Sequence, residues 1–203
     1  KQPPSLSDPK PYHRNIVVDQ MYRGEYTTIS EAIEAANPGD RILVRSGLYQ
    51  EDLVIDKPLE IVGDGERDEI VVQTKGKNTI LFKTTIGRVA NLTLRHTRVE
   101  GFSDCVNISQ GRLTLEDCDI SSQDSFCVSI HHEADPRIRK NKIHDGYSGV
   151  SISNEGHGKI EENDIFGHTY FGVQIIFGGS STLRKNKIYN GGGGVAVCFK
   201  GQV

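Results

Sequence analysis

The chain has 203 residues, with 24 Lys and Arg against 27 Asp and Glu and a formal net charge of -3. A chain of this length forms one domain or one elongated array of repeats. Its charge balance lacks the basic footprint of a nucleic-acid-binding protein, and no run of about 18 apolar residues is present that would span a membrane. We therefore expect neither a nucleic-acid partner nor a membrane partner.

The N-terminal residues and the cysteines narrow the class further. Residues 1–11 are polar and rich in proline, without the apolar core of a signal peptide. Four cysteines in 203 residues are too few for a disulfide-stapled scaffold, and none forms a CxxC pair. We expect no metal ion and no cofactor. Both features favour an intracellular location. We assign residues 1–23 to an N-terminal extension and residues 24–203 to one domain.

A short helix is predicted at the start of this domain. Ile29, Ile33 and Ala36 recur at helical spacing, and the sequence Asn-Pro-Gly-Asp at 37–40 ends the pattern. We expect a helix at about 29–37 that caps the first coil and covers its exposed edge. Strands are predicted to follow at residues 42–44, 53–55, 59–62, 70–72, 80–82 and 89–94.

An internal repeat determines the predicted fold. Four segments with the same pattern end, 22 or 23 residues apart, at Ile120, Ile143, Ile165 and Ile188. A second short strand recurs at the same step, beginning at Val106, Val128, Val150, Val173 and Val195. Such strands bury a face only by stacking in register at about 4.8 Å, and each repeat is too short to hold a helix as well. We predict an all-β, single-stranded parallel β-helix with coils over about residues 40–200.

The last residues, 198–203, begin a further turn, so we expect the solenoid to be truncated at its C-terminal end. An open last coil exposes unpaired strand edges, and these favour end-to-end self-association.

The repeat also aligns side chains into columns along the solenoid. Three columns alternate in charge from coil to coil: Glu116, Arg139, Glu161 and Arg184; Asp117, Lys140, Glu162 and Lys185; Asp119, Lys142, Asp164 and Lys187. We interpret them as structural ladders that fix register.

A fourth column, Cys118, Asn141, Asn163 and Asn186, is predicted to be an asparagine ladder. A fifth contains Cys105, Cys127, Gly149, Gly172 and Gly194, which indicates positive φ or close backbone approach. Cys105 and Cys127 are either disulfide-bonded or two small buried thiols.

Aromatic side chains stack in the same way, either to shield the coils or to form a platform for a sugar or a peptide. The aligned sets are His144, Phe166 and Tyr189; His132, Asn154, Phe177 and Phe199; Tyr147 and Tyr170; and Phe126 near Phe171. The turn at 168–171 is one residue longer than its neighbours, and projecting turns tend to carry binding. We therefore predict a ligand-binding surface formed by Tyr147, Tyr170 and Phe171, with His144 and His168 at its margin.

Two parts of the sequence resemble known families. Residues 26–33 (YTTISEAI) and 38–49 (PGDRILVRSGLY) resemble the opening of pectin-lyase-like β-helix proteins. Residues 135–146 and 156–166 are similar to the carbohydrate-binding and sugar hydrolase (CASH) β-helix region of F-box-only ubiquitin-ligase subunits and their bacterial relatives. The resemblance covers about residues 24–200. It implies a right-handed β-helix that recognises a protein or glycan partner.

A polysaccharide-acting enzyme (a lyase, hydrolase or uronate epimerase) is the alternative function. The candidate catalytic groups are Asp117, Asp119, His144, Asp145 and Tyr147. We expect the lysines in the next coil to favour the ionised form of the first two carboxyls, which does not suit a general acid. The Asp-Pro dipeptide at 135–136 also continues differently from the motif of the epimerases. We therefore expect a non-catalytic binding scaffold, which could serve substrate recognition in a larger protein.

Overall fold

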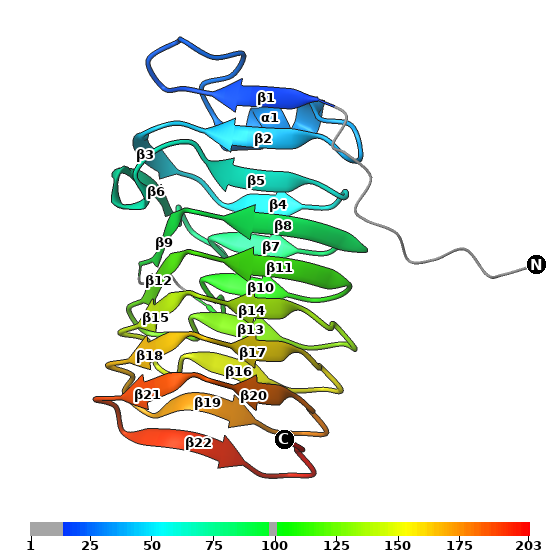
Figure 1. The fold of residues 1–203 in the computed structure, drawn as a ribbon, viewed down its shortest axis with the longest axis vertical. Helices are drawn as coiled ribbons and strands as arrows, with labels where there is room; N and C mark the ends of the chain where they lie inside the picture. The colour runs from blue at the N-terminus through cyan, green and yellow to red at the C-terminus, as the bar shows by residue number, and fades with distance from the viewer. Residues whose placement is uncertain (1–13, 98–100) are drawn as a thin grey trace, which may run out of the picture.

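The computed structural model describes residues 14–97 and 101–203. The predicted residues 1–13 of the extension lie outside this range. The described chain winds into a solenoid of about eight turns, with its coils stacked from the blue N-terminal end to the red C-terminal end in Figure 1. All strand pairings form three parallel sheets, so the predicted β-helix is confirmed. No helix in the described part of the chain is long and apolar enough to cross a bilayer.

Each full coil contributes one strand to each sheet. Sheet A has eight strands: β1 (Asn15–Val18), β2 (Arg41–Val44), β5 (Glu60–Gly63), β8 (Ile86–Ala90), β11 (Arg112–Glu116), β14 (Arg137–Arg139), β17 (Lys159–Glu161) and β20 (Thr182–Arg184). Sheet B has seven: β3 (Gly47–Gln50), β6 (Ile70–Gln73), β9 (Thr93–His96), β12 (Asp119–Ser122), β15 (Lys142–His144), β18 (Asp164–Phe166) and β21 (Lys187–Tyr189). Sheet C has seven: β4 (Leu53–Ile55), β7 (Ile80–Phe82), β10 (Val106–Ile108), β13 (Val128–Ile130), β16 (Val150–Ile152), β19 (Phe171–Ile175) and β22 (Gly193–Val197).

The N-terminal end is covered as the sequence predicted. Helix α1 (Ile29–Ala35) begins after Thr28, whose hydroxyl accepts a hydrogen bond from the Glu31 amide at 3.2 Å. Its apolar face is buried, so the capping helix is confirmed. Strand β1 lies in the segment assigned to the extension, and it pairs with β2 as the first strand of sheet A.

Aliphatic side chains fill the interior in continuous columns, because every second residue of each strand points inward. Sheet B, for example, stacks six of them in register: Val72, Leu94, Ile120, Ile143, Ile165 and Ile188. All but the last, half-buried one are fully buried. The repeat of branched aliphatic residues therefore sets the register of the coils.

A left-handed residue bends the chain between sheets A and B in five successive coils. These residues have φ between 54° and 57° and occupy one column: Asn91, Asp117, Lys140, Glu162 and Lys185. The first of them divides the segment 89–94, which we predicted as one strand. The chain instead forms β8 and β9, separated by this bend, so that prediction was wrong at this point.

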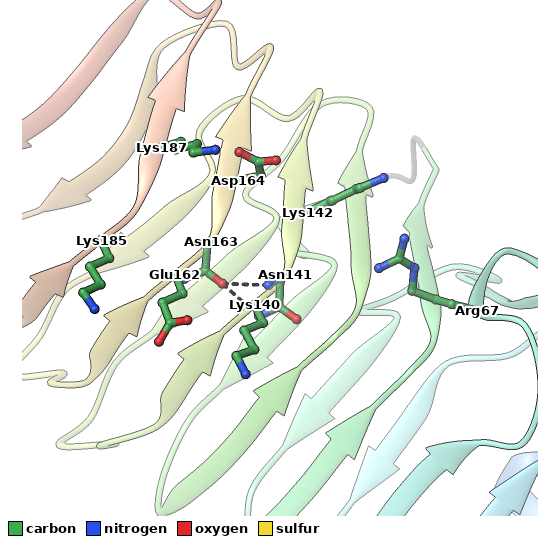
Figure 2. Close-up of a pocket in the computed structure, with 9 residues that line it drawn as sticks. All are labelled: Arg67, Lys140, Asn141, Lys142, Glu162, Asn163, Asp164, Lys185 and Lys187. Atoms are coloured by element: carbon green, nitrogen blue, oxygen red, sulfur yellow. Dashed lines mark hydrogen bonds between the residues drawn. The ribbon is translucent and has the colours of Figure 1, made fainter.

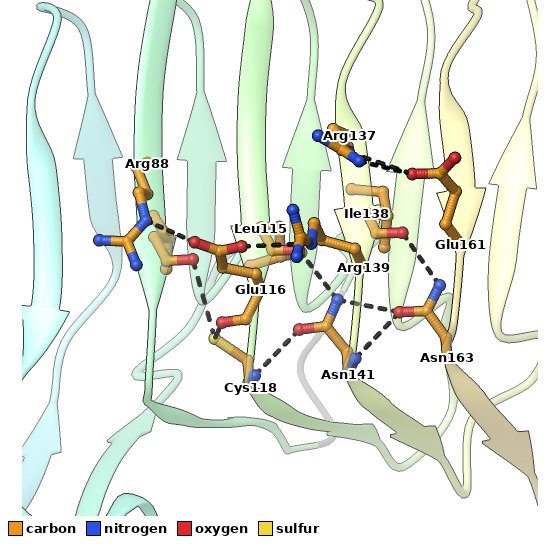
Figure 3. Close-up of polar contacts among 11 residues, drawn as sticks. Arg88, Leu115, Glu116, Cys118, Arg137, Ile138, Arg139, Asn141, Glu161 and Asn163 are labelled. Atoms are coloured by element: carbon orange, nitrogen blue, oxygen red, sulfur yellow. Dashed lines mark hydrogen bonds and ion pairs between the residues drawn. The ribbon is translucent and has the colours of Figure 1, made fainter. Parts of the chain in front are cut away.

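The predicted asparagine ladder lies directly behind the bend (Figure 3). The Asn163 side-chain oxygen accepts a hydrogen bond from the Asn141 backbone amide at 3.0 Å, and its side-chain amide donates to the Ile138 carbonyl at 3.0 Å. Asn141 makes the equivalent bonds to Cys118 and Leu115. Because both asparagines are buried, these bonds satisfy the backbone groups that the bend takes out of the sheets.

Close approach, and not positive φ, explains Gly149 and Gly172 in the glycine and cysteine column, whereas a Cβ atom at Gly194 would meet nothing within 4 Å. A Cβ atom at Gly149 would lie 2.4 Å from the Gly172 carbonyl oxygen, and none of the three glycines in the column has a positive φ. Cys105 and Cys127 are fully buried free thiols. Burial raises the pKa of the Cys105 thiol to about 12, so it behaves as a small apolar side chain.

Candidate functional site

The turns that join sheet B to sheet C carry a ladder of aromatic rings. Tyr147 stacks on Tyr170 with ring centroids 4.3 Å apart, as predicted. Phe126 contacts Tyr147 edge-on at 5.9 Å. We had placed Phe126 near Phe171, but these two rings belong to one column two coils apart. Phe126 and Tyr147 line a hollow on the side of the solenoid.

This hollow, which we call the aromatic cleft, has a volume of about 650 Å3. Its lining combines three rings, two carboxyl groups and several small polar groups: Phe102, Phe126, Tyr147, Asp104, Asp124, Ser103, Asn107 and Ser125. Phe102 is fully exposed and Tyr147 is partly exposed. A cleft with apolar walls and a few convergent polar groups is the usual form of a ligand site.

Asp104 is a carboxyl of the cleft that neighbouring side chains hold in place. Its Oδ2 accepts a hydrogen bond from Ser129 Oγ at 2.7 Å and a longer one from Asn107 Nδ2 at 3.4 Å. The residue is half-buried, and this burial raises the pKa of its carboxyl above the ordinary value. No salt bridge to Asp104 is formed within the described residues.

A row of polar side chains continues from Asp104 along the outer face of sheet C. His131 Nε2 lies 2.8 Å from Asn107 Oδ1, and Gln174 Nε2 donates to Ser151 Oγ at 3.0 Å. The row follows the strand register through Asn107, Ser129, Ser151 and Gln174. It therefore gives the cleft a polar extension parallel to the solenoid axis.

His96 lies behind the cleft and supports its turns. Its Nε2 lies 3.1 Å from Ser103 Oγ, and its Nδ1 lies 3.3 Å from Ser122 Oγ and from Ser125 Oγ. Burial lowers the pKa of His96 and so disfavours the charged ring. It holds two successive turns together and takes a structural part in the site.

The predicted binding residues of the 168–171 turn have different positions. Tyr170 is exposed and Phe171 is half-buried. His168 is buried; its Nδ1 accepts a hydrogen bond from the Gly146 amide at 3.1 Å, and its Nε2 lies 3.0 Å from the Ile143 carbonyl oxygen. The ring therefore fixes the turn from inside and is not available at the surface.

The candidate catalytic residues separate into different places. His144 lies between two carboxyls, with Nε2 2.7 Å from Asp119 Oδ1 and Nδ1 2.7 Å from Asp145 Oδ2, and it stacks on Phe166 at 5.0 Å. The hydrogen bond to Asp119 is the main cause that raises the pKa of His144 and lowers that of the carboxyl. Tyr147 belongs to the aromatic cleft and not to this cluster. A histidine between two carboxyls favours the charged ring, and both of its nitrogens are engaged by hydrogen bonds.

Asp117 lies at the bend between sheets A and B, where a charged groove follows the solenoid. Figure 2 shows its C-terminal part, of about 510 Å3, lined by Arg67, Lys140, Lys142, Glu162, Asp164, Lys185 and Lys187. Arg67 and Asp117 line a second hollow, of about 580 Å3. The four lysines form no ion pair within 4.0 Å in the part of the chain that the structure describes. In the two columns that contain them, the predicted alternation is therefore present in register but without close contacts.

Sequence reasoning missed the residues that form the floor and rim of the cleft, Phe102 and Asp104. They lie in the turn that precedes β10, where the chain takes a longer path than in the later coils. The sequence contained one indication that Asp104 lies near the predicted turns: it comes directly before Cys105, which is the first member of the aligned cysteine and glycine column.

Stacked parallel coils, an interior of aliphatic columns and an asparagine ladder define a solenoid protein with a lateral cleft. A family model described as the right handed beta helix region matches residues 68–203. The chain belongs to this right-handed β-helix family, as the resemblance of the sequence implied.

One curated protein is similar to this chain in sequence, and solved structures are similar to it in fold. F-box protein SKIP5 of Arabidopsis thaliana is 34% identical over 106 residues, which cover 50% of this chain and 37% of the relative. The chain therefore spans little more than a third of that protein. Pectin methylesterase PemA from Erwinia chrysanthemi has a TM-score of 0.60 at 15% identity, over 87% of this chain and 67% of the other. Pectin methylesterase from carrot has a TM-score of 0.50 at 15% identity, over 97% and 88%. At these identities the likeness to the two solved structures shows the fold alone.

Proposed function

We propose that this protein is a non-catalytic binding scaffold that recognises a partner molecule through the aromatic cleft. The observation that carries the proposal is the combination of exposed rings with a fixed carboxyl in one hollow of about 650 Å3. Exposed Phe and Tyr rings give a partner a large contact area at a low entropic cost. The relation to an F-box protein supports a role in recognition, as part of a longer chain.

The stacking of the coils explains why recognition would use these turns. The strands are fixed by register with their neighbours, whereas the turns between sheets B and C vary in length. The imidazole of His144 has both of its nitrogens engaged by Asp119 and Asp145. It therefore offers little to a substrate.

Substitutions in the rim test this function. Tyr147→Ala and Phe102→Ala should each weaken binding to any peptide or glycan found by array screening of the chain by about tenfold or more. Phe177→Ala is the matched control, because Phe177 is an exposed ring that stacks on Phe199 outside the cleft. Equal affinity of the rim variants and the wild type, with circular dichroism unchanged, would exclude the cleft as the binding site.

A polysaccharide-acting enzyme is the second candidate, and the raised pKa of Asp104 beside Asp124 favours it. The test is incubation with a panel of neutral and acidic polysaccharides, with detection of reducing ends and unsaturated sugars. Turnover by the wild type that Asp104→Asn abolishes would replace the binding function with catalysis.

A further inference from the structure

We propose that the aromatic cleft binds a cationic side chain, the ammonium of lysine or the guanidinium of arginine, presented by a protein partner. The inference deepens the proposed binding function and depends on it. It names the chemistry that the cleft selects, and it rests on three features of the described residues.

The rings are the first feature. Phe102, Phe126 and Tyr147 line the same hollow. An organic cation held over the face of such a ring is attracted by the negative potential of the π system, and the attraction grows when water is displaced. Several rings around one hollow form the arrangement that proteins use to hold ammonium groups.

The carboxyl group of Asp104 is the second feature. Its hydrogen bonds from Ser129 and Asn107 hold it in place, but these partners are neutral dipoles. Burial without a counter-charge is unfavourable for a carboxylate, and this unfavourable burial raises the pKa of Asp104. A cation arriving in the cleft supplies a counter-charge that the hydrogen-bond partners of Asp104 among the described residues do not provide.

The depth of the groups is the third feature, and it favours a side chain over an amino sugar. The rings of Phe102 and Tyr147 are exposed at the rim, whereas Asp104 is half-buried. A lysine or arginine side chain has an apolar stem and a terminal charge, so its stem can pack on the rings while its head reaches the carboxyl. A sugar would place its hydroxyls along the same path as its amine.

Small probes test the charge preference directly. The full chain is titrated with four blocked amino-acid amides, of lysine, arginine, norleucine and glutamate, while the backbone amides of Ser125, Phe126 and Tyr147 are followed by NMR. We expect the lysine and arginine amides to shift these signals with affinities at least about tenfold above that of norleucine, which has the same carbon chain without the charge. The glutamate amide should cause no saturable shift.

Two variants connect the preference to named groups. Asp104→Asn keeps the shape and the acceptor for Ser129, and it should reduce the preference for lysine over norleucine to less than about twofold. Phe102→Leu changes a fully exposed ring, so it leaves folding intact, and it should lower lysine affinity more than norleucine affinity. Asp164→Asn in the charged groove is the control and should leave every affinity unchanged.

The outcomes separate this inference from the binding function itself. Equal binding of norleucine and lysine, or a lysine preference that survives in Asp104→Asn, would overturn the inference. The binding function would still stand if Tyr147→Ala abolished binding to the array partners. Chitosan oligomers that bind as tightly as the lysine amide would overturn the assignment to a protein side chain. Array binding unaffected by Tyr147→Ala would reject the binding function itself.

Discussion

His144 shows how one side chain can couple the solenoid to pH. Its ring stacks on Phe166, and each of its nitrogens faces a carboxylate in the same or the preceding coil. Both contacts favour the protonated ring, and the pKa of His144 is therefore raised above its ordinary value near 6.5. The histidine is charged in the folded protein at a pH where it is neutral in the unfolded chain.

The direction in which stability changes with pH follows from the difference between the pKa of His144 in the folded and in the unfolded chain. A raised folded-state pKa stabilises the fold fully below about pH 6.5, and this contribution is lost as the pH rises through the folded pKa. In His144→Phe the stacking remains but the charge does not. The difference in free energy of unfolding between the wild type and this variant should therefore shrink from about pH 6 to about pH 8. Urea unfolding across this range measures it, and a difference that is constant or grows would contradict the account.

At the scale of the strand, only some of the aligned charges make close ion pairs. Arg88 pairs with Glu60 on sheet A. Glu116 of the same sheet pairs with Arg88 and, at 3.4 Å, with Arg139 (Figure 3). These side chains leave regular strands side by side. Lys140, in contrast, leaves the left-handed bend and remains exposed in the charged groove. Opposite charges in one column are thus not sufficient for an ion pair. Whether two side chains meet depends on whether they leave a strand or the bend.

Two charge reversals compare these environments. Arg139→Glu places three carboxylates in one column of sheet A, with Glu116 and Glu161, and should lower the free energy of unfolding by about 1–2 kcal/mol. Lys140→Glu should lower it by less than about 0.5 kcal/mol, because its neighbours are exposed and more distant. Chemical denaturation at low salt checks both values. If both variants lowered the free energy of unfolding equally, the position of a charge in the bend or in the strand would make no difference to its repulsion.

The sequence predicted the elements that the repeat specifies and missed those outside it. Regular isoleucines set the coil register, whereas β3 was missed because Leu48 and Tyr49 give only one inward apolar side chain. The cleft could not be predicted for the same reason, since Phe102 and Asp104 lie in a turn without a counterpart in the alignment. His168 was assigned to the surface because the pattern does not reveal its hydrogen bonds to backbone groups of the preceding coil.

At the scale of the whole molecule, the two ends of the solenoid differ. Helix α1 lies at the N-terminal end and β22 at the C-terminal end (Figure 1). Val195 and Val197 of β22 are exposed in this chain. The unpaired edge of a parallel strand and a row of exposed aliphatic side chains both favour association.

We therefore predict that the 203-residue chain associates through this end. Sedimentation velocity should detect a concentration-dependent dimer, and Val197→Lys should weaken it by about tenfold, because a charge would be buried in the contact. Val54→Lys is the control, since Val54 is equally exposed on the first strand of sheet C. A monomer at all concentrations, or an equal effect of the two variants, would exclude this contact.

The alternation of charge along the columns has a consequence for how the array can grow or shrink. The sequence Arg-Lys-Asn-Lys-Ile occurs after Ile138 and again after Leu183, 45 positions apart, and the acidic coil between them matches the one at Leu115. The unit that can be duplicated or excised without like charges meeting is thus a pair of coils, one acidic and one basic. A variant without residues 139–183 should unfold with little dependence on salt, whereas one without residues 139–160, which brings Glu161 beside Glu116, should be stabilised by added sodium chloride.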